Sequence, residues 1–110
     1  MKMESVKEGA IVRLSIAHFK PEQTDKVESM LNNEFKNHVA PAIKRLRGHI
    51  AFYVGIDKEK LTMSNVSFWE TKEDALQMGT LKEMADMRAT FKALGIEFNE
   101  MTNHDILWML

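Results

Sequence analysis

The chain has 110 residues, of which 45% are hydrophobic and 28% charged, an ordinary composition for one folded domain and not that of a disordered chain. Fifteen Lys and Arg against sixteen Asp and Glu leave a formal net charge of -1, so the charge balance favours neither a nucleic-acid nor a membrane partner. There is no Cys, which excludes disulfides and thiolate chemistry and fits a cytoplasmic location. We expect a single domain over residues 1–110, with no secretory leader and no membrane-spanning run.

The first half of the chain predicts a strand followed by a long helix. Apolar and polar residues alternate between Ala10 and Lys20, which is the two-residue period of a strand. After Pro21, apolar residues recur every three or four positions as far as Leu46, which indicates one helix. Pro41 falls inside this stripe, so we expect the helix to kink or split there. Gly48 is placed to end it.

The second half predicts two strands, a helix and a last strand. His49–Ile56 and Leu61–Trp69 form a hairpin, Thr71 caps a helix that ends at Gly95, and His104–Leu110 is the last strand. The order strand-helix-strand-strand-helix-strand predicts a ferredoxin-like α+β fold. In this fold both helices cover one face of a four-stranded antiparallel sheet, with the last strand beside the first.

The sheet is expected to be apolar on both faces. Alternation in the first strand sets Val12, Leu14 and Ile16 toward the helices and Arg13 toward the other face. The last strand carries apolar residues on both sides. Because two helices cover only one face, the other would leave a large apolar patch in water. We therefore expect an isologous homodimer whose sheets pack face to face.

The chain resembles the dimeric α+β barrel superfamily, and within it the antibiotic-biosynthesis-monooxygenase-like proteins. The resemblance covers nearly the whole chain and includes the element order. It also rests on these segments: Val12-Arg13-Leu14 through Phe19-Lys20-Pro21, Arg47-Gly48, and Phe68-Trp69-Glu70-Thr71. The resemblance implies the fold, a homodimer and a cavity between sheet and helices.

The resemblance does not carry over a catalytic set. In such proteins the third strand commonly reads acid, any residue, Trp; Trp69 matches the Trp, whereas Ser67 stands at the acid position. The heme-degrading members use an Asn, a Trp and a His, and their positions look like Leu14, Gln77 and Arg88 here. Heme degradation is therefore not expected, and we expect no cofactor.

Methionine and aromatic side chains predict an apolar cleft for a lipophilic small molecule. The chain has nine Met residues, which are flexible and suit surfaces that adapt to an apolar ligand, although the same residues also serve as plain core. Candidate polar anchors are His18, Tyr53 and Asn65. The full set expected to line the cleft is Leu14, Ile16, His18, Phe35, Phe52, Tyr53, Asn65, Phe68, Trp69, Met84, Met87, Phe91 and Trp108.

Four rim residues are the candidates for further chemistry. We expect His18, His49, Trp69 and His104 to share one end of the sheet, with His18 near His104. A two-histidine metal site there is conceivable, but no carboxylate has matching spacing. We therefore favour ordinary hydrogen bonds and predict no metal.

A charge in the middle of a strand needs a partner. Arg13 is expected to pair with Asp105, with Glu70 or with an acid of a partner chain. The functional alternative is that Arg13 anchors an anion.

Three functions stay open. The first is a binder of a lipophilic small molecule in the cleft. The second is a cofactor-independent monooxygenase acting on a quinol or phenolic substrate, with His18 or Tyr53 as the base. The third is a purely structural dimerising module, which predicts a cavity too small for a ligand.

Overall fold

The computed structural model describes residues 8–110 and has the ferredoxin-like α+β fold that the sequence predicts. The strands are β1 (Ile11–His18), β2 (His49–Asp57), β3 (Thr62–Trp69) and β4 (Glu100–Asp105). The first helical run comprises the 3-10 turn η2 (Pro21–Gln23), α1 (Thr24–Met30), the π-helix η3 (Leu31–Val39) and α2 (Ala40–Lys44). The second comprises α3 (Lys72–Leu76), the 3-10 turn η4 (Gln77–Gly79) and α4 (Lys82–Ala93). The expectation of no secretory leader falls on residues 1–7 and lies outside the described residues.

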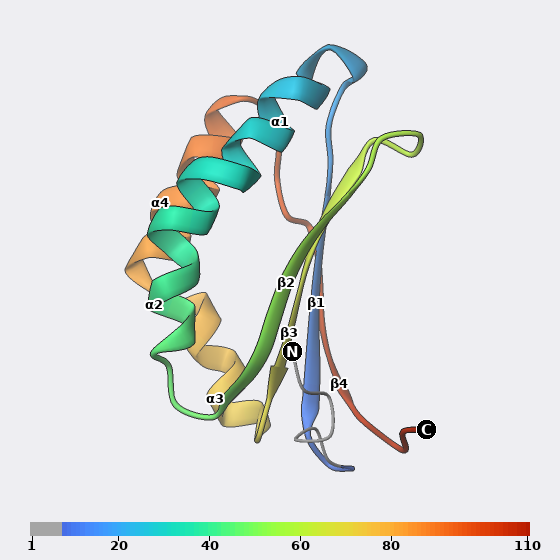
Figure 1. Cartoon of the computed structure of the whole chain (residues 1–110), viewed down its shortest axis with the longest axis vertical. Helices are drawn as coiled ribbons and strands as arrows, with labels where there is room; N and C mark the ends of the chain where they lie inside the picture. The colour runs from blue at the N-terminus through green and yellow to red at the C-terminus, as the bar shows by residue number, and fades with distance from the viewer. Residues whose placement is uncertain (1–7) are drawn as a thin grey trace.

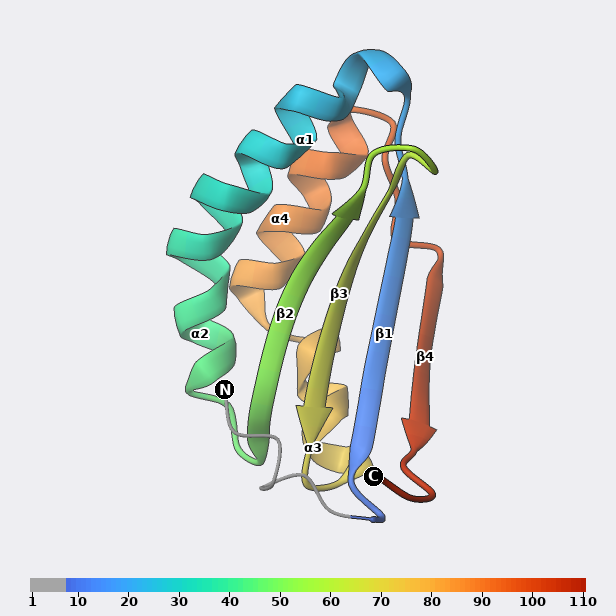
Figure 2. The ribbon, with the colours of Figure 1, turned by 45° about the vertical axis from the view of Figure 1, so that its right-hand side comes forward.

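All four strands form one antiparallel sheet in the order β2-β3-β1-β4, and the helices lie on one of its faces (Figures 1 and 2). β3 lies between β1 and β2 and is antiparallel to both, so β1 and β2 run in the same direction. His104 pairs with Val12 near one end of β1, whereas His18 pairs with Thr62 at the other end. Six residues of extended chain separate these positions by roughly 20 Å. The predicted shared rim is therefore wrong for His18, and a site joining it to His104 is excluded.

The first helical run changes its hydrogen bonding ahead of Pro41, which is where the sequence predicts an interruption. η3 spans nine residues with π geometry, and the Ala40 N–H donates to the Phe35 carbonyl. Pro41 has no N–H to donate and its ring crowds the preceding turn, so a wider turn before it relieves the conflict. The run still buries one apolar face through Val27, Leu31 and Val39.

The faces of β1 are opposite to the prediction. Ile11, Arg13, Ser15, Ala17 and Phe19 are buried, and they lie under the helices. Val12, Leu14 and Ile16 are half-buried on the open face. Alternation shows which residues share a face but not which face the helices cover. Because one set of alternate residues in β1 contains Arg13 and Ser15, the sequence suggests that this set faces away from the helices. The open face nevertheless is apolar at its centre, where Val12, Leu14 and Ile16 lie beside Val66 and Phe68.

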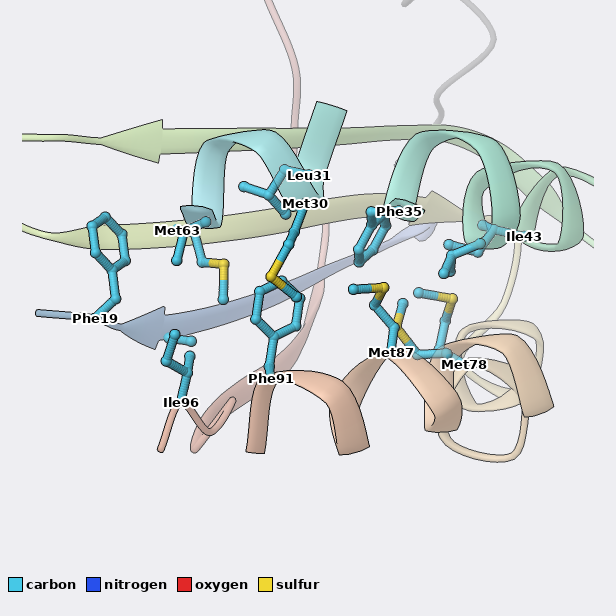
Figure 3. Packing of buried hydrophobic residues seen from close by; sticks show 14 of the residues in the cluster. Phe19, Met30, Leu31, Phe35, Ile43, Met63, Met78, Met87, Phe91 and Ile96 are labelled. Atoms are coloured by element: carbon cyan, nitrogen blue, oxygen red, sulfur yellow. The ribbon is translucent and has the colours of Figure 1, made fainter. Parts of the chain in front are cut away.

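The layer between sheet and helices is filled by methionine and aromatic side chains (Figure 3). Phe35 and Phe91 project toward each other's helix from η3 and α4, and both are at most 1% exposed. Phe35 stacks on Phe52 of β2 with ring centroids 5.8 Å apart. Met78 and Met87 fill the space beside them. Methionine side chains, which have many rotamers, therefore fill the space between the more rigid aromatic and aliphatic ones.

The last strand differs from the prediction. β4 ends at Asp105, and the apolar residues 107–110 lie beyond it and are exposed. β4 pairs with β1 from Glu100 opposite Ile16 to Asp105 opposite Ile11, so its position is set by the length of β1. It is a polar edge strand, and of the predicted strand His104–Leu110 only His104 and Asp105 belong to it. No helix in residues 8–110 is long and apolar enough to cross a membrane.

The two halves are joined at one end of the sheet by a polar contact. Arg47 Nε donates to Asp74 Oδ1 at 2.7 Å, and Asp74 N donates to Thr71 Oγ1 at 3.1 Å, which is the predicted helix cap. The hydrogen bond from Arg47 lowers the pKa of the Asp74 carboxyl, and the Thr71 side chain lowers it further through its interaction with the same carboxyl. Gly48 has φ +75° and lies so close that a Cβ would overlap the Asp74 carboxylate. Only glycine fits here without strain.

Candidate functional site

A small polar chamber lies between the sheet and the second helical run. It has a volume of about 10 Å³, which is room for roughly one water molecule. Its lining residues come from β1, β3, β4, η4, α4 and the segment before β4: Arg13, Ser15, Asn65, Met78, Met84, Arg88, Phe98 and Met101. Half of them are polar or charged and half are apolar. The chamber therefore offers hydrogen-bonding groups inside a flexible apolar wall.

Arg13 is the most unusual residue of the chamber. It is 6% exposed, and its guanidinium donates from Nη1 to Asn103 Oδ1 at 3.2 Å and from Nη2 to Met101 Sδ at 3.5 Å. Thioether sulfur is a weak acceptor. Burial lowers the pKa of Arg13 from its usual value, and the positive charge of Arg88 lowers it further. The two guanidinium groups thus repel each other in a partly dehydrated space.

The predicted ion pairs of Arg13 with Asp105 and with Glu70 are wrong, whereas pairing with an acid of a partner chain stays a prediction. Within residues 8–110 neither Arg13 nor Arg88 lies within ion-pair distance of a carboxylate. Asp105 and Glu70 are exposed and form no ion pair with Arg13, which lies on the helix side of the sheet. Arg88 Nη2 donates to the Gly79 carbonyl at 3.3 Å. The alternative, that Arg13 anchors an anion, stays a prediction, and the neutral acceptors of its hydrogen bonds are compatible with it.

Asn65 and Ser15 add neutral hydrogen-bonding groups to the chamber. Both are buried, at 5% and 4% exposed, and they pair with the neighbouring strands on the helix side of the sheet. Next along β3, Trp69 donates from Nε1 to Ser67 Oγ at 2.8 Å, and both residues are fully buried. Trp69 therefore has a satisfied indole N–H and stiffens this part of the sheet.

A larger groove, here called the outer groove, lies between α4 and the segment that follows it. It has a volume of about 330 Å³ and is lined by Arg88, Ala89, Lys92, Ile96, Glu97, Phe98 and Asn99. Arg88 and Phe98 belong to both the groove and the chamber, so these two side chains form the wall between them. Lys92 and Glu97 form an ion pair at 3.8 Å across one side. Movement of Arg88 and Phe98 would join the two spaces.

A second groove follows the opposite edge of the sheet. It has a volume of about 220 Å³ and lies between η3 and β2, with Leu31, Phe35, Phe52, Tyr53 and Val54 among its lining residues. Its polar lining residues, Asn32, Lys36 and Tyr53, are exposed, whereas Arg13, Ser15 and Asn65 of the chamber are buried. We regard the chamber as the better candidate, because convergent polar anchors inside an apolar wall characterise ligand sites.

The residues predicted to line one cleft fall on two faces. Those on the helix side are Phe35, Phe52, Asn65, Trp69, Met84, Met87 and Phe91. Those on the open face are Leu14, Ile16, His18 and Phe68, so their predicted position between sheet and helices is wrong. Tyr53 pairs with Val66 of the open face but also lines the groove between η3 and β2. Trp108 is 66% exposed beyond β4 and lines neither space. Of the whole set, only Asn65 and Met84 reach the chamber.

The histidines make ordinary contacts. His18 Nε2 lies 2.9 Å from Glu100 Oε1, and both side chains are largely exposed. His49 contacts the edge of Trp69, with ring centroids 5.7 Å apart, and burial lowers the pKa of its imidazole. Among the described residues no group of three or more His, Asp or Glu is arranged to hold a metal ion.

Sequence reasoning did not place Arg88, Phe98 and Met101 in a site. The sequence does not show whether Met87 or its neighbour Arg88 belongs to the apolar stripe of their helix. Phe98 and Met101 lie in a stretch without periodicity. Arg13 is the residue from which the site could have been found. It is charged, lies in the middle of a strand and is two positions from Ser15, so the two residues indicate a polar patch on one face. Only the position of the helices shows that this face is the buried one.

No protein-family model matches the chain, and no curated protein sequence matches it. Solved structures with the same fold are known. A protein of Deinococcus radiodurans assigned by name to the antibiotic biosynthesis monooxygenases superimposes with a TM-score of 0.72 at 13% identity, covering 91% of this chain and 95% of the other. One of Nitrosomonas europaea with the same assignment gives a TM-score of 0.67 at 13% identity, covering 93% and 94%.

A monooxygenase of Streptomyces coelicolor, solved in complex with the ligand nanaomycin D, gives a TM-score of 0.66 at 12% identity, covering 94% and 91%. At these identities the similarity establishes a shared fold. The chain therefore has the α+β fold of the antibiotic-biosynthesis-monooxygenase-like proteins, as the resemblance of its residues implied.

Proposed function

We propose that this chain, with the fold of the antibiotic-biosynthesis-monooxygenase-like proteins, binds a lipophilic small molecule between its sheet and helices. The observation that carries the proposal is the polar chamber: Arg13, Ser15, Asn65 and Arg88 converge on a space walled by methionine and phenylalanine side chains. Burial of these polar and charged side chains lowers the free energy of unfolding, and apolar side chains could fill the same positions in the core. A ligand that uses them explains their position.

The wall of the chamber is suited to opening. In the structure the chamber holds no more than about one water molecule, whereas drug-sized ligands need roughly 300–1,000 Å³. Met84 and Met101 are unbranched and change rotamer at low cost. Displacing them together with Phe98 would merge the chamber with the outer groove of about 330 Å³. The ligand body would then occupy the groove and its polar end the chamber.

We also propose that the functional unit is a homodimer, and that it is cytoplasmic. Val12, Leu14 and Ile16 of β1, with Val66 and Phe68 of β3, form a half-buried apolar area at the centre of the open face. No helix in residues 8–110 covers it (Figure 1). A second copy packed sheet to sheet would remove this area from water. The absence of Cys supports a reducing compartment.

A specific observation favours a second candidate, cofactor-independent oxygenation of a quinol or phenol. Two guanidinium groups beside a bound hydroxyl would stabilise its anion, and the anion is the form that reacts with oxygen. The candidate bases His18 and Tyr53 do not line the chamber, so they do not fit this role there. Oxygen consumption with model quinols should then fall in Arg13 and Arg88 variants and persist when His18 and Tyr53 are replaced. Equal rates in all variants would exclude the assignment.

Native mass spectrometry of freshly purified protein tests the binding proposal. We expect a co-purifying small molecule, or a rise in Tm with members of a lipid and quinone panel. Ala89→Trp should abolish either signal, because Ala89 is exposed on α4 and lines the outer groove. Ala93→Trp is the matched control, since Ala93 is exposed on the same helix and does not line that groove. A bare chain with no Tm shift across the panel would favour the purely structural alternative.

A further inference from the structure

Arg13 presents an unresolved electrostatic problem in the folded chain. The residue is 6% exposed and its guanidinium contacts are partly buried, so its charge has lost part of its hydration. The groups that accept its hydrogen bonds, the Asn103 amide oxygen and the Met101 sulfur, are neutral. A buried charge normally has an opposite charge beside it, because the cost of dehydration is otherwise not recovered.

Arg88 makes the imbalance larger. It lines the same chamber and adds a second positive charge, strong enough to lower the pKa of Arg13. It donates a hydrogen bond to the neutral Gly79 carbonyl. Across residues 8–110 the ion pairs all involve other residues, although the chain as a whole carries sixteen carboxylates. Among residues 8–110 the two guanidinium groups of the chamber therefore have no carboxylate at ion-pair distance.

We infer that the ligand of the chamber is an organic acid, whose anionic oxygens lie between the guanidinium groups of Arg13 and Arg88. This inference rests on the proposed function and specifies its ligand class. A planar guanidinium presents paired N–H donors that match a carboxylate or an enolate, and hydrogen bonds to charged groups are the strong ones. Asn65 and Ser15 supply neutral contacts at the same end.

The apolar part of the acid follows from the outer groove. Ala89, Ile96 and Phe98 give one side of the groove an apolar surface directly beyond Arg88. A molecule that places its acidic end in the chamber would extend its body over these residues. The predicted ligand is thus an amphipathic monoanion, not a neutral lipid and not a free inorganic anion.

Paired probes with one skeleton and different charge test this inference. We would measure the Kd of naphthoate against naphthamide, and of decanoate against decanamide, by isothermal titration calorimetry of the full chain. Each acid should bind at least about tenfold more tightly than its amide, as expected for a charge-assisted hydrogen bond in a dehydrated site. In Arg88→Gln and Arg13→Met the acid should lose at least about tenfold in affinity and the amide no more than about threefold.

Arg45→Gln is the matched control. Arg45 is exposed at the end of α2, lines neither space and should leave both members of each pair unchanged. If Arg13→Met does not fold, Arg88→Gln carries the test from a half-buried position on a helix.

The possible outcomes separate the two proposals. If acid and amide bind equally well, and the arginine variants change neither, the inference is wrong and the proposed function stands. If no probe of either pair binds, the proposed function fails and the inference with it. If sodium chloride raises the Tm as much as naphthoate does at equal concentration, the requirement for an organic body is refuted.

Discussion

Replacing Arg13 by methionine should stabilise the unliganded protein. The change removes a dehydrated positive charge whose hydrogen-bond partners are neutral and which lies beside the second charge of Arg88. Removing an unpaired buried charge recovers several kcal/mol of dehydration cost. Against this stands the hydrogen bond to Asn103, worth roughly 1.5–3 kcal/mol for a charged donor. Asn103 is only half-buried, so water can replace part of that bond.

The net effect should be a gain of about 1–3 kcal/mol in the free energy of unfolding. For a domain of this size a change of 1 kcal/mol corresponds to roughly 4 °C, so the Tm should rise by about 4–12 °C. Thermal unfolding followed by circular dichroism, together with urea titration, measures both quantities. Saturating naphthoate should raise the Tm of the unsubstituted chain and not that of Arg13→Met. A variant that loses more than about 1 kcal/mol without ligand would show that Arg13 is a structural residue, and our reasoning about an uncompensated charge would be refuted.

Three further predictions concern the rest of the molecule. Leu14→Lys places a charge in the centre of the open face and should convert a dimer to a monomer in sedimentation velocity runs, whereas Leu76→Lys on the exposed side of α3 should leave the dimer intact. Gly48→Ala should cost at least roughly 1–2 kcal/mol in urea titration, because its φ of +75° is strained for alanine and the new Cβ meets Asp74; an unchanged midpoint would contradict the geometry. The pKa of Asp74 is lowered in the folded state, mainly by Arg47, so this contact stabilises the fold above the ordinary value of 3.8 and is lost as the pH falls through the folded pKa. Asp74→Asn should therefore flatten the decline of stability below about pH 4, and an unaltered acid limb would rule out the contribution.

The element order and the chain reversals follow from local sequence. Thr71 caps a helix with its hydroxyl, Gly48 and Gly95 take positive φ at helix ends, and Pro41 coincides with a change of helical hydrogen bonding. Each of these depends on the conformational preference of one residue and its close neighbours. Such preferences are visible in the sequence without knowledge of the tertiary contacts.

The site depends on information that is not local. Alternation in β1 does not show which set of alternate side chains the helices cover. In this structure the covered set contains Arg13 and Ser15. For a protein that only has to fold, the more apolar parity of Val12, Leu14 and Ile16 would be the natural inner face. The inversion therefore places polar groups where a ligand can use them and apolar groups where a second copy can cover them. Departures from the simplest pattern are expected at functional sites.

The position of the last strand was likewise set by pairing and not by hydrophobicity. β4 is polar and lies at an edge, and β1 fixes its register through the pair Ile11 and Asp105. Residues 107–110 are more apolar but pair with no strand among residues 8–110. A hydrophobic pattern identifies a buried strand well and an edge strand poorly, because an edge strand gains little from burial.

A crystal structure of the protein soaked with naphthoate would test the central claim most directly. We predict that the carboxylate lies within hydrogen-bond distance of the Arg13 guanidinium, with Arg88 turned toward it, Phe98 and Met101 displaced, and the ring in the outer groove. Naphthoate bound on the open face of the sheet, or in the groove between η3 and β2, with the chamber still closed, would contradict the account.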